Sequence, residues 1–437
     1  MRDILLLNGH LVDPAAGIDA PRDLLLRGGL VAAVETPGTL RDVQDAETID
    51  ASGLVVAPGL VDIHVHLREP GQTYKETIAT GTAAAAAGGF TTVVAMPNTV
   101  PVNDSIATTQ WIQNADRGAA VNLFCMPAAT VGSMGGTLTD FETLRDVGGA
   151  VGFTDDGKPI LDAAVMRSAL IAAARCGVPI SQHAEDTRLT GGCSMNAGPV
   201  AFRLGLRGMP IEAEAGIVER DIALLREIEI SEGLQPHLHV QHVSTARALQ
   251  AIRDARREGL RVTCEVAPHH FTLTENAVGD YDTNAKMNPP LRSESDRLAV
   301  IEAILDGTVD CLASDHAPHA RHEKEVEFER APNGITGLDT ALGLALLVLH
   351  REHGMPLAKI VTLMSTNPAA LVLPKEYGAL TRGSRADLVI FNASKEWHYD
   401  VASTRSKSRN TPFGGALMLG RVHSTTCGGD IVFRQRD

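Results

Sequence analysis

The pattern of hydrophobic and polar positions divides the chain into two ends and a middle. At both ends the apolar runs are short and are interrupted by Gly, Asn and Pro, which predicts strands and turns. In the middle, short apolar runs alternate with longer stretches whose apolar positions recur every three or four residues, the period of an amphipathic helix. The sequence therefore predicts a β-rich region at each end and alternating strands and helices between them.

Six strands are expected at the chain ends, at 4–7, 23–26, 30–34, 386–391, 416–419 and 430–433. Neither end is long enough to build a stable sheet core by itself. Packing the two ends together would solve this, and chain ends often lie close to each other. We therefore expect residues 1–57 and 372–437 to form one small, composite, β-sandwich-like domain.

Eight strands are expected in the middle of the chain, at 60–64, 91–95, 121–125, 149–153, 178–182, 238–241, 260–266 and 309–313. The expected helices lie at 74–87, 105–119, 163–176, 211–229, 244–259 with Ser244 as N-cap, 293–305, 337–352 and 357–368. Alternating strands and helices favour a parallel sheet with right-handed crossovers. Eight such units predict an α/β fold of the (β/α)8 TIM-barrel type, which we place at residues 58–371.

Composition excludes several classes of function. The 437 residues carry a net charge of -14, which argues against nucleic-acid binding. No run of about 20 apolar residues predicts a membrane span, and the apolar stretch at the N-terminus is too short for a signal peptide. Six scattered cysteines without a CxxC pair are typical of free thiols in a reducing compartment. We therefore expect a cytoplasmic location.

His64 and His66 lie at the end of the first predicted barrel strand. Side chains alternate between the two faces of a strand, so both imidazoles point to the same side. Two imidazoles so placed can bind one divalent metal. The same two-residue pattern also fits two hydrogen-bonded polar residues at a strand end.

Further polar residues follow other predicted strands; they are Asn98, Asp156, His183, His242 and Asp315. Alone, each histidine could be a hydrogen-bonded core residue, Asp155-Asp156-Gly157 a turn and Asp315 a helix cap. A barrel, however, gathers strand ends at one mouth, where four imidazoles and two carboxylates need a cation among them. Nitrogen and oxygen ligands suit Zn²⁺, with Mn²⁺ or Co²⁺ as substitutes. The ligands outnumber one tetrahedral shell, which predicts two metals about 3.5–4 Å apart, bridged by hydroxide.

Several motifs resemble those of the dihydroorotases, within the cyclic amidohydrolase superfamily. The resembling segments are 60–71 (LVDIHVHLREPG), 96–99, 153–157, 242–245, 286–292 and 313–319. They occur in the expected order, and the similarity extends from about residue 2 to 433. The resemblance implies a zinc-dependent amidohydrolase barrel with a β-domain built from both chain ends.

The resemblance also implies a ligand set for two zinc ions per subunit: His64, His66 and Asp315 for one, His183 and His242 for the other, with Asp156 bridging. Asp155 remains open as an alternative bridge. Relatives such as hydantoinases typically bridge the metals with a carboxylated lysine. Lys158 stands two residues beyond Asp156, so we do not expect a lysine bridge here.

The implied activity is the reversible interconversion of (S)-dihydroorotate and N-carbamoyl-L-aspartate in de novo pyrimidine biosynthesis. A metal-bridged hydroxide would attack the ring carbonyl, and Asp315 would pass its proton to the leaving nitrogen. The implied substrate-binding residues are His66, Arg68, Asn98, Asn288, His319, Asn333 and Gly334. Arg68 suits a carboxylate, although a surface salt bridge is its structural alternative. The family often has an aromatic residue where Asn333 stands, which leaves the packing over the ring open.

The sequence also bears on a charged loop, on two further histidines, on alternative functions and on partners. The charged stretch 321–330 fits a solvated loop or a lid that closes over substrate. His269 and His270 follow a barrel strand and are expected to have supporting or structural roles. The alternatives to a dihydroorotase are another cyclic amidohydrolase, such as an allantoinase or a dihydropyrimidinase, and a non-catalytic subunit. We expect a homodimer and consider aspartate carbamoyltransferase as a partner.

Overall fold

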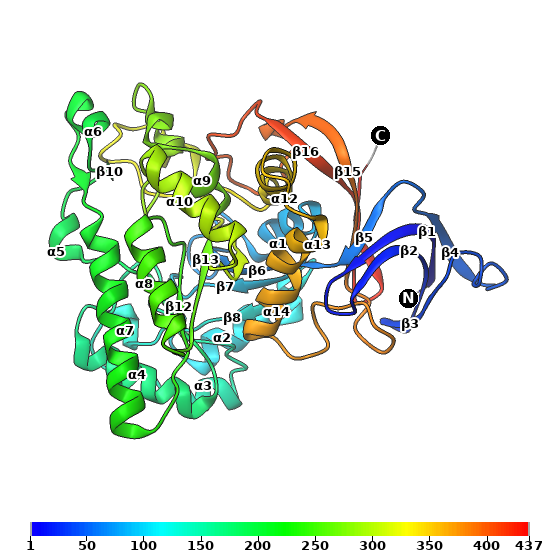
Figure 1. Ribbon diagram of the computed structural model, residues 1–437, viewed down its shortest axis with the longest axis horizontal. Helices are drawn as coiled ribbons and strands as arrows, with labels where there is room; N and C mark the ends of the chain where they lie inside the picture. The colour runs from blue at the N-terminus through cyan, green and yellow to red at the C-terminus, as the bar shows by residue number, and fades with distance from the viewer. Residues whose placement is uncertain (1, 436–437) are drawn as a thin grey trace.

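The computed structural model describes residues 2–435 and contains two assemblies of strands (Figure 1). One is a sheet formed by both chain ends, in which the blue strands of the N-terminal end lie beside the orange and red strands of the C-terminal end. The other is a ring of parallel strands with helices on its outside. The predicted α/β class, with a barrel and a β-region made from both ends, is confirmed.

The end sheet has eight strands: β1 (Asp3–Asp13), β2 (Ile18–Arg27), β3 (Leu30–Glu35), β4 (Ala46–Asp50), β5 (Val55–Pro58), β15 (Leu388–His398), β16 (Leu417–Cys427) and β17 (Asp430–Arg434). Strand β5 joins the two chain ends because it is parallel to β1 and antiparallel to β15. The six predicted strands are present but most are longer, and the sequence pattern did not reveal β4 and β5. The division of the chain at 57/58 and 371/372 stays a prediction.

Strand β1 pairs with two neighbours along the same edge. Its first half pairs with β4 and its second half with β5, and its register with β2 shifts between Leu6 and Gly9. A Cβ atom at Gly9 would lie 2.6 Å from a methyl group of Val56, so only glycine allows this close approach. Leucine and isoleucine side chains of β1, β2 and β15 form the core of the sheet.

Seven barrel positions are regular parallel strands: β6 (Leu60–Val65), β7 (Phe90–Ala95), β8 (Asn122–Cys125), β9 (Ile180–Gln182), β12 (Leu238–Val240), β13 (Val262–Val266) and β14 (Cys311–Leu312). The predicted strand at 149–153 is reduced to one bridge between Phe153 and Ile180. A second bridge, between Val65 and His316, joins the last strand position to the first and closes the ring.

The helices on the outside of the barrel are α1 (Ile78–Ala87), α2 (Ile106–Gln113), α3 (Phe141–Asp146), α4 (Ala163–Cys176), α7 (Glu212–Glu232), α8 (Ala246–Arg257), α10 (Glu294–Leu305), α12 (Ala341–Ala345), α13 (Leu357–Val361) and α14 (Asn367–Val372). The π-helical turns η5 (Leu346–Glu352) and η6 (Thr362–Thr366) continue α12 and α13. The pattern did not predict α3.

Shorter elements lie in the connections: α5 (Thr187–Thr190), β10 (Met195–Asn196), α6 (Pro199–Leu204), β11 (Gly208–Met209), α9 (Pro268–Thr272), α11 (Arg321–Lys324) and the 3-10 turns η1 (Ala115–Arg117), η2 (Val131–Ser133), η3 (Glu275–Val278), η4 (Thr283–Ala285) and η7 (Val401–Ser403). The excursion from α5 to β11 projects away from the end sheet (Figure 1).

The prediction that Ser244 caps helix α8 is wrong. Thr245 is the N-cap, and its side chain accepts a hydrogen bond from the amide of Ala248. The Ser244 hydroxyl donates instead to the buried carboxylate of Glu214, which also accepts from the amides of Ser244 and Thr245. A buried carboxylate requires several donors, and this requirement moves the helix start by one residue.

Among residues 2–435, no helix combines the length and the apolar character needed to cross a membrane. All six cysteines are free thiols, and Cys125, Cys264 and Cys311 are buried.

Candidate metal centre

Six predicted ligands lie at the carboxyl ends of the barrel strands. His64 and His66 belong to β6 or follow it directly, and the others follow the Phe153 position, β9, β12 and β14; they are Asp156, His183, His242 and Asp315. None of the six is more than 5% exposed to solvent. Parallel strands of a barrel end at the same mouth, which explains how residues so distant in sequence meet here.

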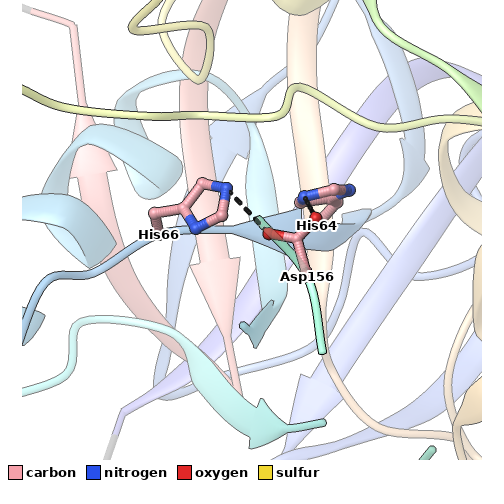
Figure 2. A group of neighbouring side chains, drawn as sticks. All are labelled: His64, His66 and Asp156. Carbon is pink, nitrogen blue, oxygen red and sulfur yellow. Dashed lines mark ion pairs between the residues drawn. The ribbon is translucent and has the colours of Figure 1, made fainter. Parts of the chain in front are cut away.

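Asp156 lies between the imidazoles. Its Oδ1 is 3.4 Å from Nε2 of His64, and its Oδ2 is 3.5 Å from Nε2 of His66; both contacts are drawn in Figure 2. The same Oδ1 lies 3.7 Å from Nδ1 of His183 and 3.7 Å from Nε2 of His242. One carboxylate therefore contacts all four histidines.

Asp315 follows the last barrel strand, β14, and also contacts the first two histidines. Its Oδ1 lies 3.2 Å from Nε2 of His66 and 3.5 Å from Nε2 of His64. Burial disfavours an ionised carboxylate, but the positive potential of His64 and the hydrogen bond from His66 outweigh it and hold the Asp315 pKa below its usual range. Asp315 is therefore ionised at neutral pH.

The neighbour of Asp156 points away from the histidines. Asp155 accepts hydrogen bonds from the amide and the hydroxyl of Thr130, so its carboxylate stabilises a loop. Lys158 is exposed, and its Nζ contacts the sulfur of Met134. Of the residues considered as a bridge, the structure brings only Asp156 to the histidines.

The donor atoms fit a divalent metal. His64 Nε2 and Asp156 Oδ1 are buried and have no hydrogen-bond partner, although they face each other. Three overlapping groups each bring their donor atoms within 4.8 Å: His64, His66 and Asp156; His64, His242 and Asp315; Asp156, His183 and His242. Imidazole nitrogens and carboxylate oxygens, desolvated and unpaired, are what a bound cation satisfies.

In three of the histidines, the ring nitrogen on the far side from Asp156 contacts a side-chain oxygen. The pairs are His64 Nδ1 with Glu265 Oε1 (2.5 Å), His66 Nδ1 with Asn98 Oδ1 (2.9 Å) and His183 Nε2 with Glu185 Oε2 (3.0 Å). An oxygen acceptor fixes a proton on the contacted nitrogen and leaves the other nitrogen free to bind metal. The fourth ring differs, because His242 Nδ1 is buried without a partner.

A cavity of about 250 Å³ opens beside the ligands. It is lined by five of the six, and by Arg68, Asn98, Asn288, His319 and Asn333 from the predicted substrate-binding set. Gly334 is not among the lining residues: its amide donates to the carbonyl of Lys286, and its carbonyl accepts from the side chain of Asn410. The structure therefore brings Asn333, but not its neighbour, to the cavity.

Arg68 and His319 lie side by side in the cavity wall. Arg68 Nη2 is 3.3 Å from His319 Nε2, and Arg68 Nε donates to the carbonyl of Pro318. Burial, together with the nearby cations Arg68 and Lys75, lowers the His319 pKa to about 2, so its ring is neutral. Its Nε2 lies 2.8 Å from the carbonyl of Asn333, to which it can donate.

Comparison with known proteins gives the chain its family. A family profile described as dihydro-orotase-like matches residues 53–248. A dihydroorotase of Geobacter sp. (strain M21) is 45% identical over 433 residues, which cover 99% of each chain. A dihydroorotase of Anaeromyxobacter dehalogenans (strain 2CP-1) is 46% identical over 440 residues, covering 100% of this chain and 99% of that one. The chain belongs to the dihydroorotase family.

Membership of the dihydroorotase family confirms the resemblance drawn from the motifs, and with it the class of cyclic amide hydrolase and the function of a dihydroorotase in pyrimidine biosynthesis. Solved structures of similar fold include an L-hydantoinase (dihydropyrimidinase) from Arthrobacter aurescens, with a TM-score of 0.87 and 26% identity over 100% of this chain and 97% of that one. A dihydropyrimidinase from Brevibacillus agri, with a TM-score of 0.84 and 24% identity over 99% and 95%, shares the fold.

Three residues of this dihydroorotase-family site have an unusual backbone. Arg68, His242 and Asp315 have positive φ angles of 59°, 32° and 46°. Such conformations of residues other than glycine cost of order 1–3 kcal/mol each and are found preferentially at functional sites. Strain at these positions supports the assignment of the cavity as the active site.

Two buried lysines hold the charged stretch 321–330. Lys324 Nζ donates to the carbonyls of Thr283 and Pro332, each at 2.8 Å. Lys286 Nζ donates to the carbonyls of Phe328, Glu329 and Ala331, at 2.7 to 2.9 Å. The stretch is thus fixed beside the cavity in this conformation, and movement as a lid stays a prediction.

Sequence reasoning missed two acidic residues that contact the ligands, Glu185 and Glu265. Glu185 stands two residues after His183, and Glu265 lies within the predicted strand 260–266, so a charged residue beside a candidate ligand or inside a predicted barrel strand was the available signal. His269 and His270 are buried in α9, and His270 Nε2 lies 3.0 Å from the carbonyl of Pro289. Neither lines the cavity, and a supporting role stays a prediction.

Proposed function

We propose that this member of the dihydroorotase family interconverts (S)-dihydroorotate and N-carbamoyl-L-aspartate in the cavity described above. The observation that supports this most is that one cavity is lined both by metal-type ligands and by Arg68 and His319. A small cyclic amide with a carboxylate matches such a lining, because a guanidinium binds a carboxylate through two charge-assisted hydrogen bonds. Identity of 45% to a dihydroorotase over nearly the whole chain supports the same substrate.

We propose two zinc ions per subunit, because three overlapping donor groups exceed what one ion can use. The ligands would be His64, His66 and Asp315 for one ion, His183 and His242 for the other, and Asp156 for both. When bound, the ions lower the pKa of a coordinated water towards ~7 and polarise the amide carbonyl.

Asp315 is proposed as the general acid and base. It is ionised and buried, and it lies beside His66, so it can accept a proton from the attacking water. Returning that proton to the ring nitrogen allows the amide bond to break. Ring closure of N-carbamoyl-L-aspartate follows the same proton path in the opposite direction.

The substrate would be held by groups that still have unused hydrogen-bonding capacity. Asn98 uses its Oδ1 on His66, which leaves its amide hydrogens for the carboxylate beside Arg68. Asn288 Oδ1 is buried without a partner and can accept from a ring N–H. Gly334 remains in the predicted set from the family resemblance alone.

The decisive experiment couples metal analysis to a dihydroorotate assay. Chelation should remove metal and activity together, and adding zinc back should restore both. An enzyme that turns over a dihydropyrimidine or allantoin but not dihydroorotate would instead be a hydantoinase-type enzyme. An intact protein that binds no metal would favour a non-catalytic subunit.

We also propose a cytoplasmic homodimer that associates with aspartate carbamoyltransferase. Six free cysteines support a reducing compartment. Light scattering of the purified protein should give twice the mass of one chain, and the mass should increase when aspartate carbamoyltransferase from the same source is added. A monomer that remains unchanged with the second enzyme present would contradict both assemblies.

A further inference from the structure

A continuous chain of hydrogen-bonding side chains leads from the metal centre into the barrel interior. Alternation places His237 and His239 on one face of the β12 segment, and Thr263 and Glu265 on one face of β13. The contacts are His64 Nδ1 to Glu265 Oε1 (2.5 Å), His239 Nε2 to Glu265 Oε2 (3.2 Å), His239 Nδ1 to Thr263 Oγ1 (2.9 Å) and His237 Nε2 to Thr263 Oγ1 (2.8 Å). The three histidines and Glu265 are at most 5% exposed.

The chemistry of these groups fixes the direction of every hydrogen bond. The two oxygens of the Glu265 side chain face His64 Nδ1 and His239 Nε2, and they accept the hydrogens that these nitrogens carry. With its hydrogen on Nε2, His239 accepts at Nδ1 from the hydroxyl of Thr263. Thr263 in turn accepts from His237 Nε2.

His237, the last residue of this series of hydrogen bonds, agrees with this direction. Burial and the nearby Arg261 lower the His237 pKa to about 3, so the ring is neutral and carries one hydrogen. Its Nδ1 is buried without a partner, as expected if the hydrogen is on Nε2.

We propose, given the metal-binding role proposed for His64, that Glu265 and His239 are positioning residues for the metal centre. Glu265 holds the hydrogen of His64 on Nδ1 and so keeps the Nε2 lone pair directed at Asp156 and the metal. His239 holds the second oxygen of Glu265 and thereby fixes the carboxylate in the plane that His64 requires. Neither residue lines the cavity, so their effect passes through His64.

A separate metal site at this position is the competing interpretation. His239, Glu265 and Cys311 bring donor atoms within 4.8 Å of one another. However, both nitrogens of His239 and both oxygens of Glu265 are already hydrogen-bonded, and burial raises the Cys311 pKa well above its usual value. His239 and Glu265 therefore have their hydrogen bonds complete without a cation, which favours a supporting role for the proposed metal centre.

The test measures zinc affinity by competition with a chromophoric chelator. Glu265→Gln presents a single amide oxygen, which can accept from only one of the two histidines, while its NH2 group faces the N–H of the other; this disturbs the orientation of His64. We expect zinc to bind roughly 10- to 100-fold more weakly, in line with other residues that hold metal ligands. Asp13→Asn is the matched control, because Asp13 is also a fully buried carboxylate but caps a turn in the end sheet.

Two further variants separate positioning from packing. His239→Gln retains an amide N–H for Glu265 and should keep zinc affinity within a fewfold of the unmodified protein. His239→Leu fills similar space without a donor and should weaken zinc binding as Glu265→Gln does. Unchanged zinc affinity in Glu265→Gln, or equal losses in His239→Gln and His239→Leu, would overturn the positioning roles. Absence of zinc binding by the unmodified protein would instead overturn the proposed function.

Discussion

Nε2 of His183 donates a hydrogen bond to Oε2 of Glu185 at 3.0 Å, with one residue between them in the chain. The same oxygen accepts from Nδ2 of Asn288 at 2.8 Å. One carboxylate therefore joins a proposed metal ligand to a proposed substrate-binding residue. Glu185→Ala should lower zinc affinity roughly 10- to 100-fold and also raise KM for dihydroorotate. Zinc titration and steady-state kinetics measure the two effects.

Glu185→Gln is the control for that prediction. The amide keeps an oxygen that can accept from both His183 and Asn288 and loses only the charge, so both effects should be smaller than in the alanine variant. Equal losses in the two variants would show that charge, and not the hydrogen-bonded link, accounts for the role of Glu185.

The two neighbouring aspartates should respond differently to the same substitution. Asp156→Asn should abolish binding of at least one metal, because Asp156 contacts all four histidines. Asp155→Asn should cost about 1–3 kcal/mol of stability, since it weakens the bonds from Thr130, but should keep the metals. Thermal unfolding with and without zinc measures both: zinc should raise the Tm of Asp155→Asn as it does that of the wild type, and it should raise the Tm of Asp156→Asn less or not at all. The opposite pattern would make Asp155 the bridge.

Asp315→Asn should retain the fold and most of the metal but lose catalysis. Loss of a general acid and base typically lowers kcat by about 10²–10⁴. Metal content by elemental analysis and kcat for dihydroorotate should therefore separate in this variant. A variant with wild-type kcat would contradict proton transfer by Asp315, and one without metal would show that its role is that of a ligand alone.

Arg68→Met tests carboxylate binding. Losing a charge-assisted pair worth about 2–3 kcal/mol should raise KM for dihydroorotate roughly 30- to 160-fold, with a smaller change in kcat. Lys75→Met is the control, because Lys75 contacts His319 and Glu323 but does not line the cavity. An unchanged KM in Arg68→Met would show that other donors bind the carboxylate of the substrate.

Lys324 should make stability depend on pH. Burial, with Lys286 nearby, lowers its pKa from 10.5 to about 7. The unfolded chain therefore binds one more proton than the folded chain between pH 7 and 10.5, so stability rises with pH across that window. Between pH 7 and 9 the gain should be about 2–3 kcal/mol. Denaturant unfolding of the wild type and of Lys324→Met at both pH values isolates this contribution, which the variant should lack.

The site residues that the local sequence pattern could predict are those that lie at the ends of predicted strands. His64 and His66 alternate on one strand, and His183, His242 and Asp315 each follow an apolar run, so topology alone brings them together. The choice between Asp155 and Asp156 needed the structure, because a turn can direct either side chain inward. Its outcome depends on Thr130, which offers Asp155 two donors.

Long-range polar contacts were the part that sequence could not provide. Glu265 meets His64 across 201 residues, and Glu214 takes Ser244 away from the N-cap position across 30. In the end sheet, β4 and β5 are short, and their position is decided by pairing with β1 and β15. Each of these depends on a partner that no local window contains.

The contact between the first and last barrel strands has a consequence for the synthesis of the protein itself. Val65 and His316 form the bridge that closes the ring, and His66 and Asp315 stand beside it, 249 residues apart in sequence. A nascent chain acquires the first pair of histidines early, but it has no Asp315 until the barrel is almost entirely translated. The full set of proposed ligands therefore exists only in chains that extend beyond residue 315. A product truncated before residue 315 would be left with an open ring and an incomplete ligand set.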